Sequence, residues 1–222
     1  MKTLLAAAAA LITLAAAPAG AAILPVGVQT NVAASTITGT WGFSQCWSGN
    51  YNDSASIESM LAGCQGDYLM MAAKALGSDD FIVAAAAAYA DVTFLTGGSS
   101  NPLESHEANG VEWYFNPEWS WGFAPQDAFV LTSSCDVGAV YDANFNYHDP
   151  DGSEAQRLCW HTGSGAVQHG WSAGGIGNTY DGDYERFLFV GTAGPVAAPE
   201  PGALGLLGLG VLGLATRRRR RG

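Results

Sequence analysis

Near its middle the chain reads Trp113-Tyr114-Phe115-Asn116-Pro117-Glu118-Trp119-Ser120-Trp121-Gly122-Phe123, with six aromatic residues in eleven positions. Aromatic side chains favour strands, and alternate residues of a strand point to the same face of a sheet. Trp113 would therefore share a face with Phe115, and Trp119 with Trp121. Because β domains fill their cores with large aromatic side chains, we expect strands at residues 110–115 and 120–123.

Similar short runs occur on both sides of this segment, separated by Gly, Asn, Asp and Ser clusters, a pattern typical of strands and turns. The expected strands are residues 36–43, 67–75, 81–96, 110–115, 120–123, 128–133, 157–162 and 184–191. Residues 54–62 are expected to form a short helix capped by Ser54 or Ser56. The prediction is a mainly β fold, a single jelly-roll-like β-sandwich domain with a short helix.

Two segments combine opposing signals. The run Ala84 to Ala88 favours a helix, because alanine is the best helix former, but strand-forming residues flank it on both sides. We interpret residues 81–96 as a strand, since their neighbours are strand-like and small side chains allow close sheet packing. Residues 163–182 contain seven glycines and are expected to form a loop held down by Trp171.

The N-terminus has the three features of a secretory signal peptide. Lys2 precedes an apolar run from Leu4 to Ala17, and small residues follow. Cleavage after Ala19 or after Ala21 fits the small-x-small rule, and an uncleaved anchor is the alternative. We expect a signal peptide at residues 1–21, a lead-in segment at 22–35, an exported β domain at 36–194 and a linker at 195–198.

The C-terminus also has three parts in a fixed order. It reads Pro199-Glu200-Pro201, then the uncharged segment 202–216, then the cluster Arg217, Arg218, Arg219, Arg220 and Arg221. The apolar segment can enter a bilayer, whereas a cationic cluster beside it stays on the cytoplasmic side. As a helix this segment is roughly 22 Å long, short of the about 20 residues of a full span. We expect a temporary hydrophobic helix whose arginines stop transfer, with the domain outside.

This tail resembles the PEP-CTERM sorting signal of Gram-negative bacteria, which is processed by a membrane protease-transpeptidase called exosortase. The residues that carry the resemblance are Pro199, Glu200 and Pro201, the leucine-rich segment and the terminal arginines. The resemblance implies export, a transient anchor in the inner membrane, and cleavage near Pro-Glu-Pro by an exosortase-type enzyme. It places the mature protein in the cell envelope or outside the cell. It covers about the last 24 residues and implies nothing about the activity of the domain.

The charge of the body differs from that of the two ends. Between the signals, three basic residues (Lys74, Arg157 and Arg186) stand against nineteen acidic residues, a net charge of −16. Such a field repels nucleic acid and anionic polysaccharide, so nucleic acid is excluded as a partner. It favours solubility, cation uptake or cationic partners.

Four cysteines lie in the exported body: Cys46, Cys64, Cys135 and Cys159. An even number of cysteines in an oxidising compartment predicts two disulfides. Three connectivities are open, and we favour Cys46–Cys64 with Cys135–Cys159 because each pair is close in sequence. Zinc binding by these cysteines is disfavoured, because they lack C-x-x-C spacing.

Two acidic turns are candidates for calcium, the one cofactor that the sequence suggests. Asp149 and Asp151 flank Pro150, and Asp181 and Asp183 flank Gly182. Carboxylates in turns supply the oxygen ligands that calcium prefers, but Asp and Gly also build turns without metal. The four histidines show no H-E-x-x-H spacing, so the sequence predicts no zinc centre.

Exposed tryptophans stack on sugar rings, so Trp113, Trp119 and Trp121 are candidates for carbohydrate binding, with core packing as the alternative. We expect a non-enzymatic surface or matrix component associated with exopolysaccharide. The alternative is a secreted carbohydrate-active or other hydrolytic enzyme with a carboxylate pair. The glutamates available for such a pair are Glu104, Glu107, Glu112, Glu118 and Glu154.

Overall fold

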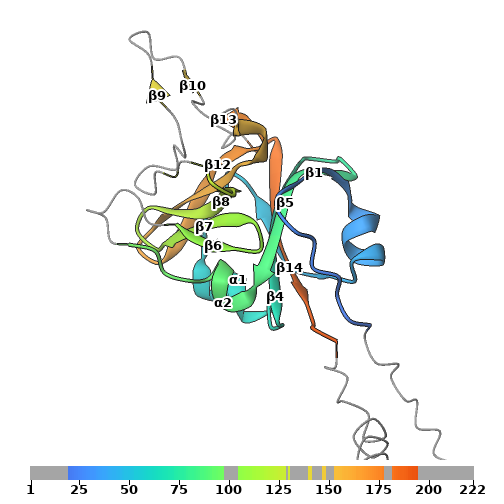
Figure 1. Cartoon of the computed structure of the whole chain (residues 1–222). Helices are drawn as coiled ribbons and strands as arrows, with labels where there is room; N and C mark the ends of the chain where they lie inside the picture. The colour runs from blue at the N-terminus through green and yellow to red at the C-terminus, as the bar shows by residue number, and fades with distance from the viewer. Residues whose placement is uncertain are drawn as a thin grey trace, which may run out of the picture.

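The computed structural model describes residues 20–97, 105–128, 130, 140–141, 147–148, 153–177 and 182–194. Two antiparallel sheets pack face to face (Figure 1). Sheet 1 has the order β1 (Gln29–Ala33), β5 (Asp80–Ala88), β4 (Tyr68–Ala75), β14 (Tyr184–Gly191), β2 (Ser44–Asn50). Sheet 2 has the order β13 (Ile176–Gly177), β12 (Ala166–Ala173), β11 (Leu158–Gly163), β8 (Ser120–Pro125), β7 (Val111–Asn116), β6 (His106–Ala108), with β3 (Ala55–Ser56) beside β12. The predicted β-sandwich is confirmed.

The remaining elements are short. Strands β9 (Val140–Tyr141) and β10 (Tyr147–His148) pair with each other. The helices are α1 (Ile57–Ala62), α2 (Tyr89–Val92), a π-helix (Thr36–Thr40) and a 3-10 turn (Glu154–Gln156). The Ser56 hydroxyl accepts a hydrogen bond from the Ser59 N–H and caps α1, so the predicted helix and one of its two predicted caps are confirmed.

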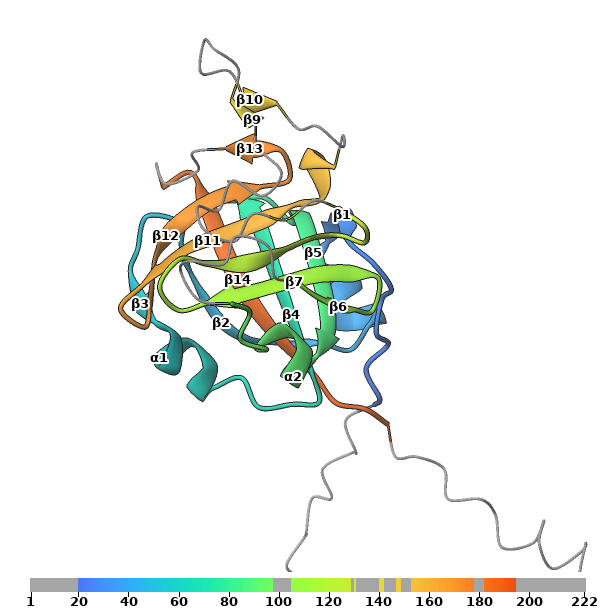
Figure 2. The same ribbon diagram turned by 60° about the vertical axis from the view of Figure 1, so that its left-hand side comes forward.

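The two sheets differ in connectivity. In sheet 2 the path from β6 to β13 is a meander in which strands that follow one another along the chain are neighbours, as Figure 2 shows. A jelly roll would instead alternate between sheets through Greek-key connections. Sheet 1 is different, because its fourth strand, β14, is the last strand of the chain and lies between β4 and β2. Sheet 1 is therefore incomplete until the end of the domain has been added.

The space between the sheets is filled mainly by aromatic side chains from sheet 2 and by aliphatic side chains from sheet 1. The inward aromatic residues are Trp113 and Phe115 on β7, Trp121 and Phe123 on β8, and Trp160 on β11. Opposite them lie residues such as Ala85 and Ala87 of β5. The alanine run is thus a strand, as predicted, and it is useful there because its side chains leave room for the indoles.

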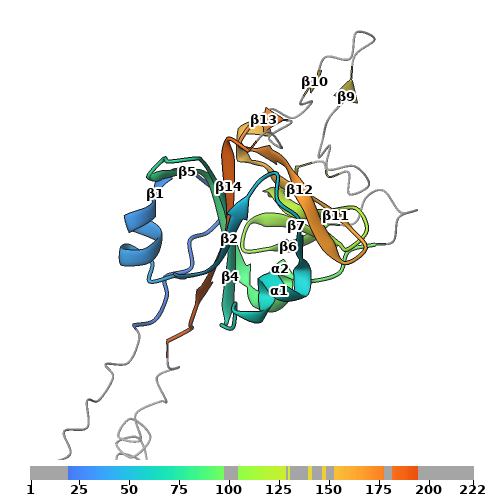
Figure 3. The ribbon, with the colours of Figure 1, turned by 180° about the vertical axis from the view of Figure 1, so that it is seen from behind.

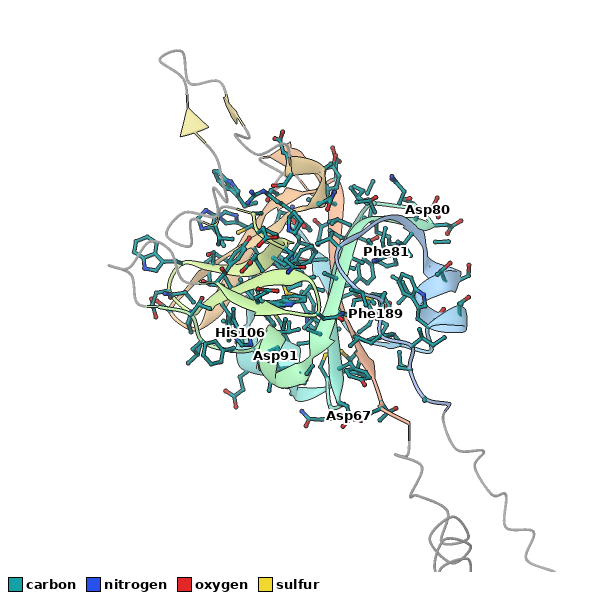
Figure 4. All side chains as sticks on the ribbon, viewed as in Figure 1. Asp67, Asp80, Phe81, Asp91, His106 and Phe189 are labelled. Carbon is teal, nitrogen blue, oxygen red and sulfur yellow. A yellow bond between two sulfur atoms is a disulfide. The ribbon has the colours of Figure 1, made fainter. Side chains whose placement is uncertain are left out.

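The outer face of sheet 1 is also buried. Residues 22–43 cross it, and Ile37 and Phe43 from this segment join a second core with Phe81, Phe187 and Phe189. The π-helix lies outside sheet 1, on the side away from sheet 2 (Figure 3). Phe81 meets the rings of Phe187 and Phe189 edge-on at 5.0 and 5.5 Å, and Figure 4 labels Phe81 and Phe189. The residues expected as a lead-in therefore belong to the domain, and Gln29–Ala33 pair with β5.

Three predictions of local structure were wrong. Residues 36–43 form the π-helix and its exit instead of a strand, because burying Ile37 against sheet 1 outweighs the strand propensity of threonine. The strand that starts at Asp80 ends at Ala88, and α2 follows it instead of more strand. The glycine-rich segment after residue 163 is not a loop, since β12 and β13 run through it. Residues 129 and 131–133 of the strand expected at 128–133 lie outside the described residues.

The segment after residue 163 was predicted as a loop because of its glycines, but these glycines have other structural roles. Ser164-Gly165 and Gly174-Gly175 have positive φ at both residues and form two-residue turns between paired strands, as type I′ hairpins require. Gly170 lies within a strand beneath the Tyr51 ring, where an added Cβ would fall 1.7 Å from Tyr51 Cδ1. These glycines therefore mark hairpin turns and close packing.

A buried arginine connects the two sheets. The Cζ atom of Arg186 on β14 lies 5.5 Å from the ring centroid of Trp47 and 5.9 Å from that of Trp160. Its Nε donates to the Asn50 carbonyl at 3.2 Å, and its Nη2 donates to the Asp53 carbonyl. Burial lowers the pKa of Arg186 to about 10, so the side chain is still charged at neutral pH. The aromatic faces and carbonyl dipoles stabilise that charge.

Replacing this side chain tests how much the sandwich depends on it. We expect Arg186→Ala to lower the free energy of unfolding by about 3 kcal/mol, because it opens a cavity between two indoles. Lys74→Ala is the control, since Lys74 is partly exposed and its ion pair with Glu185 is 3.7 Å long, worth at most about 1 kcal/mol. Urea denaturation followed by tryptophan fluorescence measures both. Equal losses in the two variants would contradict the prediction.

Candidate functional site

The two ends of the described chain meet at one pole of the domain. The Ala22 N–H donates to the Thr192 carbonyl at 2.8 Å. A Cβ added to Gly191 would lie 2.7 Å from the Ala22 Cβ, and one added to Gly194 would lie 2.6 Å from the Ala21 Cβ. Both glycines therefore allow the first and last segments to touch. In Figures 1 and 3 the blue and the orange-red ends of the coloured ribbon lie at the same end of the molecule.

Asp67 holds this terminal pole together. Its carboxylate accepts a hydrogen bond from the Ala193 N–H at 2.7 Å. Its backbone N–H donates to the Gly191 carbonyl, and its own carbonyl accepts from the Tyr89 N–H. The end of β14, the approach to β4 and the start of α2 are thus joined at one residue, which Figure 4 labels. The chain leaves the domain from a fixed point.

A disulfide braces the same strands. Cys46 on β2 is bonded to Cys64, which precedes β4. Since β14 pairs with β2 on one side and with β4 on the other, the bond links the two neighbours of the last strand. This pairing confirms the prediction from sequence. Cys159 is also disulfide-bonded, but Cys135 lies outside the described residues, so the second predicted pairing stays a prediction.

The sorting residues follow closely after this pole. Gly194 is the last residue described before the tail, and Pro199 is five positions further on, at most about 17 Å when extended. Pro199, Glu200, Pro201 and the cluster Arg217 to Arg221 lie outside the described residues. Within the part that the structure describes, no helix is both long and apolar enough to cross a membrane.

Comparison with protein-family models matches residues 197–220 to the PEP-CTERM protein-sorting motif. The chain carries a PEP-CTERM sorting motif in its C-terminal tail. Its motif makes it an exported protein that exosortase sorts and processes. Comparisons with curated proteins and with solved structures gave no match.

The three candidate tryptophans of the domain lie in different environments. Trp113 and Trp121 are buried between the sheets, with exposed fractions of 1% and 0%. They cannot stack on a sugar, and the core-packing alternative is correct for both. Trp119 retains 37% of its surface, because it lies in the turn between β7 and β8 rather than in a strand.

The turn that carries Trp119 is held against the neighbouring hairpin. The Trp119 carbonyl accepts from the Thr162 N–H at 3.0 Å. The Glu118 carboxylate accepts from the Ser164 N–H at 3.1 Å, and the Asn116 side-chain oxygen accepts from the Glu118 N–H. These hydrogen bonds hold the turn that carries the exposed Trp119 and the Glu118 carboxylate against the β11–β12 hairpin.

The predicted calcium ligands are for the most part not described. Asp149, Asp151 and Asp181 lie outside the described residues, while Asp183 lies just before β14, and its carbonyl accepts from the Leu76 N–H. No group of three or more His, Cys, Asp and Glu side chains suited to a metal was found among the described positions. Calcium binding stays a prediction.

The structure brings together two pairs of ionisable side chains that were not predicted from the sequence. Glu107 and Glu112 lie directly opposite each other on β6 and β7, but each accepts hydrogen bonds, from Gln126 and from Ser105 respectively. His106 Nε2 lies 2.8 Å from Asp91 Oδ1 (Figure 4), and its ring stacks on Phe94 at 4.6 Å. The partners are 15 positions apart and come from different elements, so no local signal could have paired them.

Removing the disulfide tests whether it stabilises the terminal pole. We expect Cys46→Ser combined with Cys64→Ser to lower the free energy of unfolding by about 3 kcal/mol, the chain-entropy value for a loop of this size. Each single variant should lose about as much as the double variant, because either change removes the same cross-link. Urea denaturation measures all three. A double variant within about 1 kcal/mol of the wild type would show that the native packing alone holds the strands.

Proposed function

We propose that this protein is a non-enzymatic component of the cell envelope or extracellular matrix that associates with exopolysaccharide. In this proposal the signal peptide at residues 1–21 starts export, and the segment 202–216 with its arginines holds the chain transiently in the inner membrane. Exosortase then cuts near Pro199-Glu200-Pro201. The domain is the part that remains to act outside.

The observation that carries the proposal is the meeting of both chain ends at the terminal pole. The hydrogen bond from Ala22 to Thr192 means that a chain held at the membrane by either end presents the same pole to it. The short connection from Gly194 to Pro199 keeps that pole close to the bilayer. The flanks and the opposite end of the sandwich then face outward, where a matrix polymer can reach them.

Trp119 is the best-supported contact for that polymer. Its exposed indole offers a stacking face, and Glu118 and Ser164 beside it offer hydrogen-bonding groups for sugar hydroxyls. The charge of −16 on the body repels anionic chains. We therefore propose a neutral or cationic polysaccharide as the ligand.

Binding to immobilised polysaccharides tests this function. We expect Trp119→Ala to lose about fivefold or more in affinity, because stacking on an aromatic ring supplies about 1 kcal/mol. Phe94→Ala is the matched control, since Phe94 is a second exposed aromatic residue, with 52% of its surface accessible. The result that would reject the proposal is failure of the wild type to bind any neutral or cationic polysaccharide, or equal weakening by both substitutions.

The arginine cluster tests the anchoring step separately. Replacing Arg217 to Arg221 by glutamine removes the charge that opposes translocation, so we expect the tail to leave the inner membrane and the uncut chain to appear outside. Fractionation and immunoblotting of the two forms measure this. A control with five lysines at the same positions should be retained like the wild type. Normal retention and processing of the glutamine variant would contradict the stop-transfer explanation.

A further inference from the structure

Two histidines face each other across neighbouring strands of sheet 2, on the β11–β12 hairpin that also holds the Trp119 turn. His161 on β11 and His169 on β12 are directly opposite in the register. Their ring centroids are 4.9 Å apart, and the Trp171 ring lies 5.0 Å from His161 and 6.5 Å from His169. Both histidines are half-buried, so an ion from solvent can reach them.

The spacing of the rings matches that of two imidazoles bound to one metal ion. With metal–nitrogen bonds of about 2.0 Å, two imidazoles on adjacent coordination positions have centroids about 4.5 to 5.2 Å apart. The observed 4.9 Å lies within that interval. The backbone at His161 is anchored, because the preceding residue, Trp160, is fully buried between the sheets.

A backbone carbonyl orients the second ring. His169 Nδ1 lies 2.8 Å from the Gly170 carbonyl oxygen. A carbonyl only accepts hydrogen bonds, so Nδ1 carries the proton and Nε2 carries the lone pair in the neutral ring. Metal-binding histidines have this arrangement, in which an outer hydrogen bond sets the tautomer and the direction of the ligating nitrogen.

We propose that His161 and His169 bind a divalent copper ion. Among the common divalent metals Cu²⁺ binds imidazole most strongly and accepts a tetragonal set of nitrogen and oxygen ligands. The acidic body attracts cations to the surface.

Titration of the mature protein with Cu²⁺, followed by calorimetry and electron paramagnetic resonance, tests this site. We expect one Cu²⁺ per chain with two nitrogen ligands. His161→Gln and His169→Gln should each weaken binding by at least about tenfold, since loss of even an outer-shell partner costs that much. His106→Gln is the matched control and should bind like the wild type, because His106 lies on β6 beside Asp91.

Trp171→Phe separates ligation from packing, because it keeps both imidazoles and preserves an aromatic ring beside them. We expect Trp171→Phe to bind Cu²⁺ like the wild type, and thermal unfolding without metal to show that every variant is folded. The proposal is overturned if the wild type shows no nitrogen-ligated Cu²⁺, or if both histidine variants keep wild-type affinity. It is also overturned if His106→Gln or Trp171→Phe loses binding as the two histidine variants do.

Discussion

The sandwich depends on one buried cation held between two indoles. Arg186 on the last strand contacts Trp47 of its own sheet and Trp160 of the other. Glycine makes this possible, because a Cβ at Gly49 would lie 2.8 Å from the Trp47 ring. One guanidinium nitrogen, Nη1, finds no acceptor among the described residues, so the aromatic faces carry much of the compensation. The contact is made only when β14 is in place, which ties the packing of the two sheets to the end of the chain.

The acidic composition suits this arrangement. A buried arginine is costly because its charge leaves water, and burial lowers its pKa accordingly. Burial raises the pKa of the neighbouring Tyr51 phenol for the same reason, so that tyrosine is neutral beside the cation. A body with many carboxylates lowers the energy of a positive charge anywhere within it. The acidic surface therefore stabilises the buried charge of Arg186 electrostatically.

Local features of the sequence were enough for the strands with aromatic residues at alternate positions, for the alanine strand and for the helix capped at Ser56. They were not enough for the glycine-rich hairpins, because Ser164-Gly165 or Gly174-Gly175 reads equally well as turn or as loop until its strands are paired. The candidate site shows the same limit. Trp119 is exposed and Trp121 is buried, but this difference follows only once the position of the turn between β7 and β8 is known. The pairing of His161 with His169 also depends on register shifts in β11, and no local sequence pattern predicts these shifts.

The place of β14 in sheet 1 links folding to sorting. Gly191 ends this strand and Gly202 begins the apolar segment. The ten residues between them let the two glycines lie at most about 36 Å apart when the chain is extended, close to the thickness of a bilayer. On the proposed route of export, β14 therefore emerges outside at about the time the apolar segment enters the membrane. Before that moment β2 and β4 lack the strand that joins them, and Arg186 has not reached its indoles. A tail that pauses there would hold the domain at the surface while the central strand is inserted and Ala22 closes against Thr192.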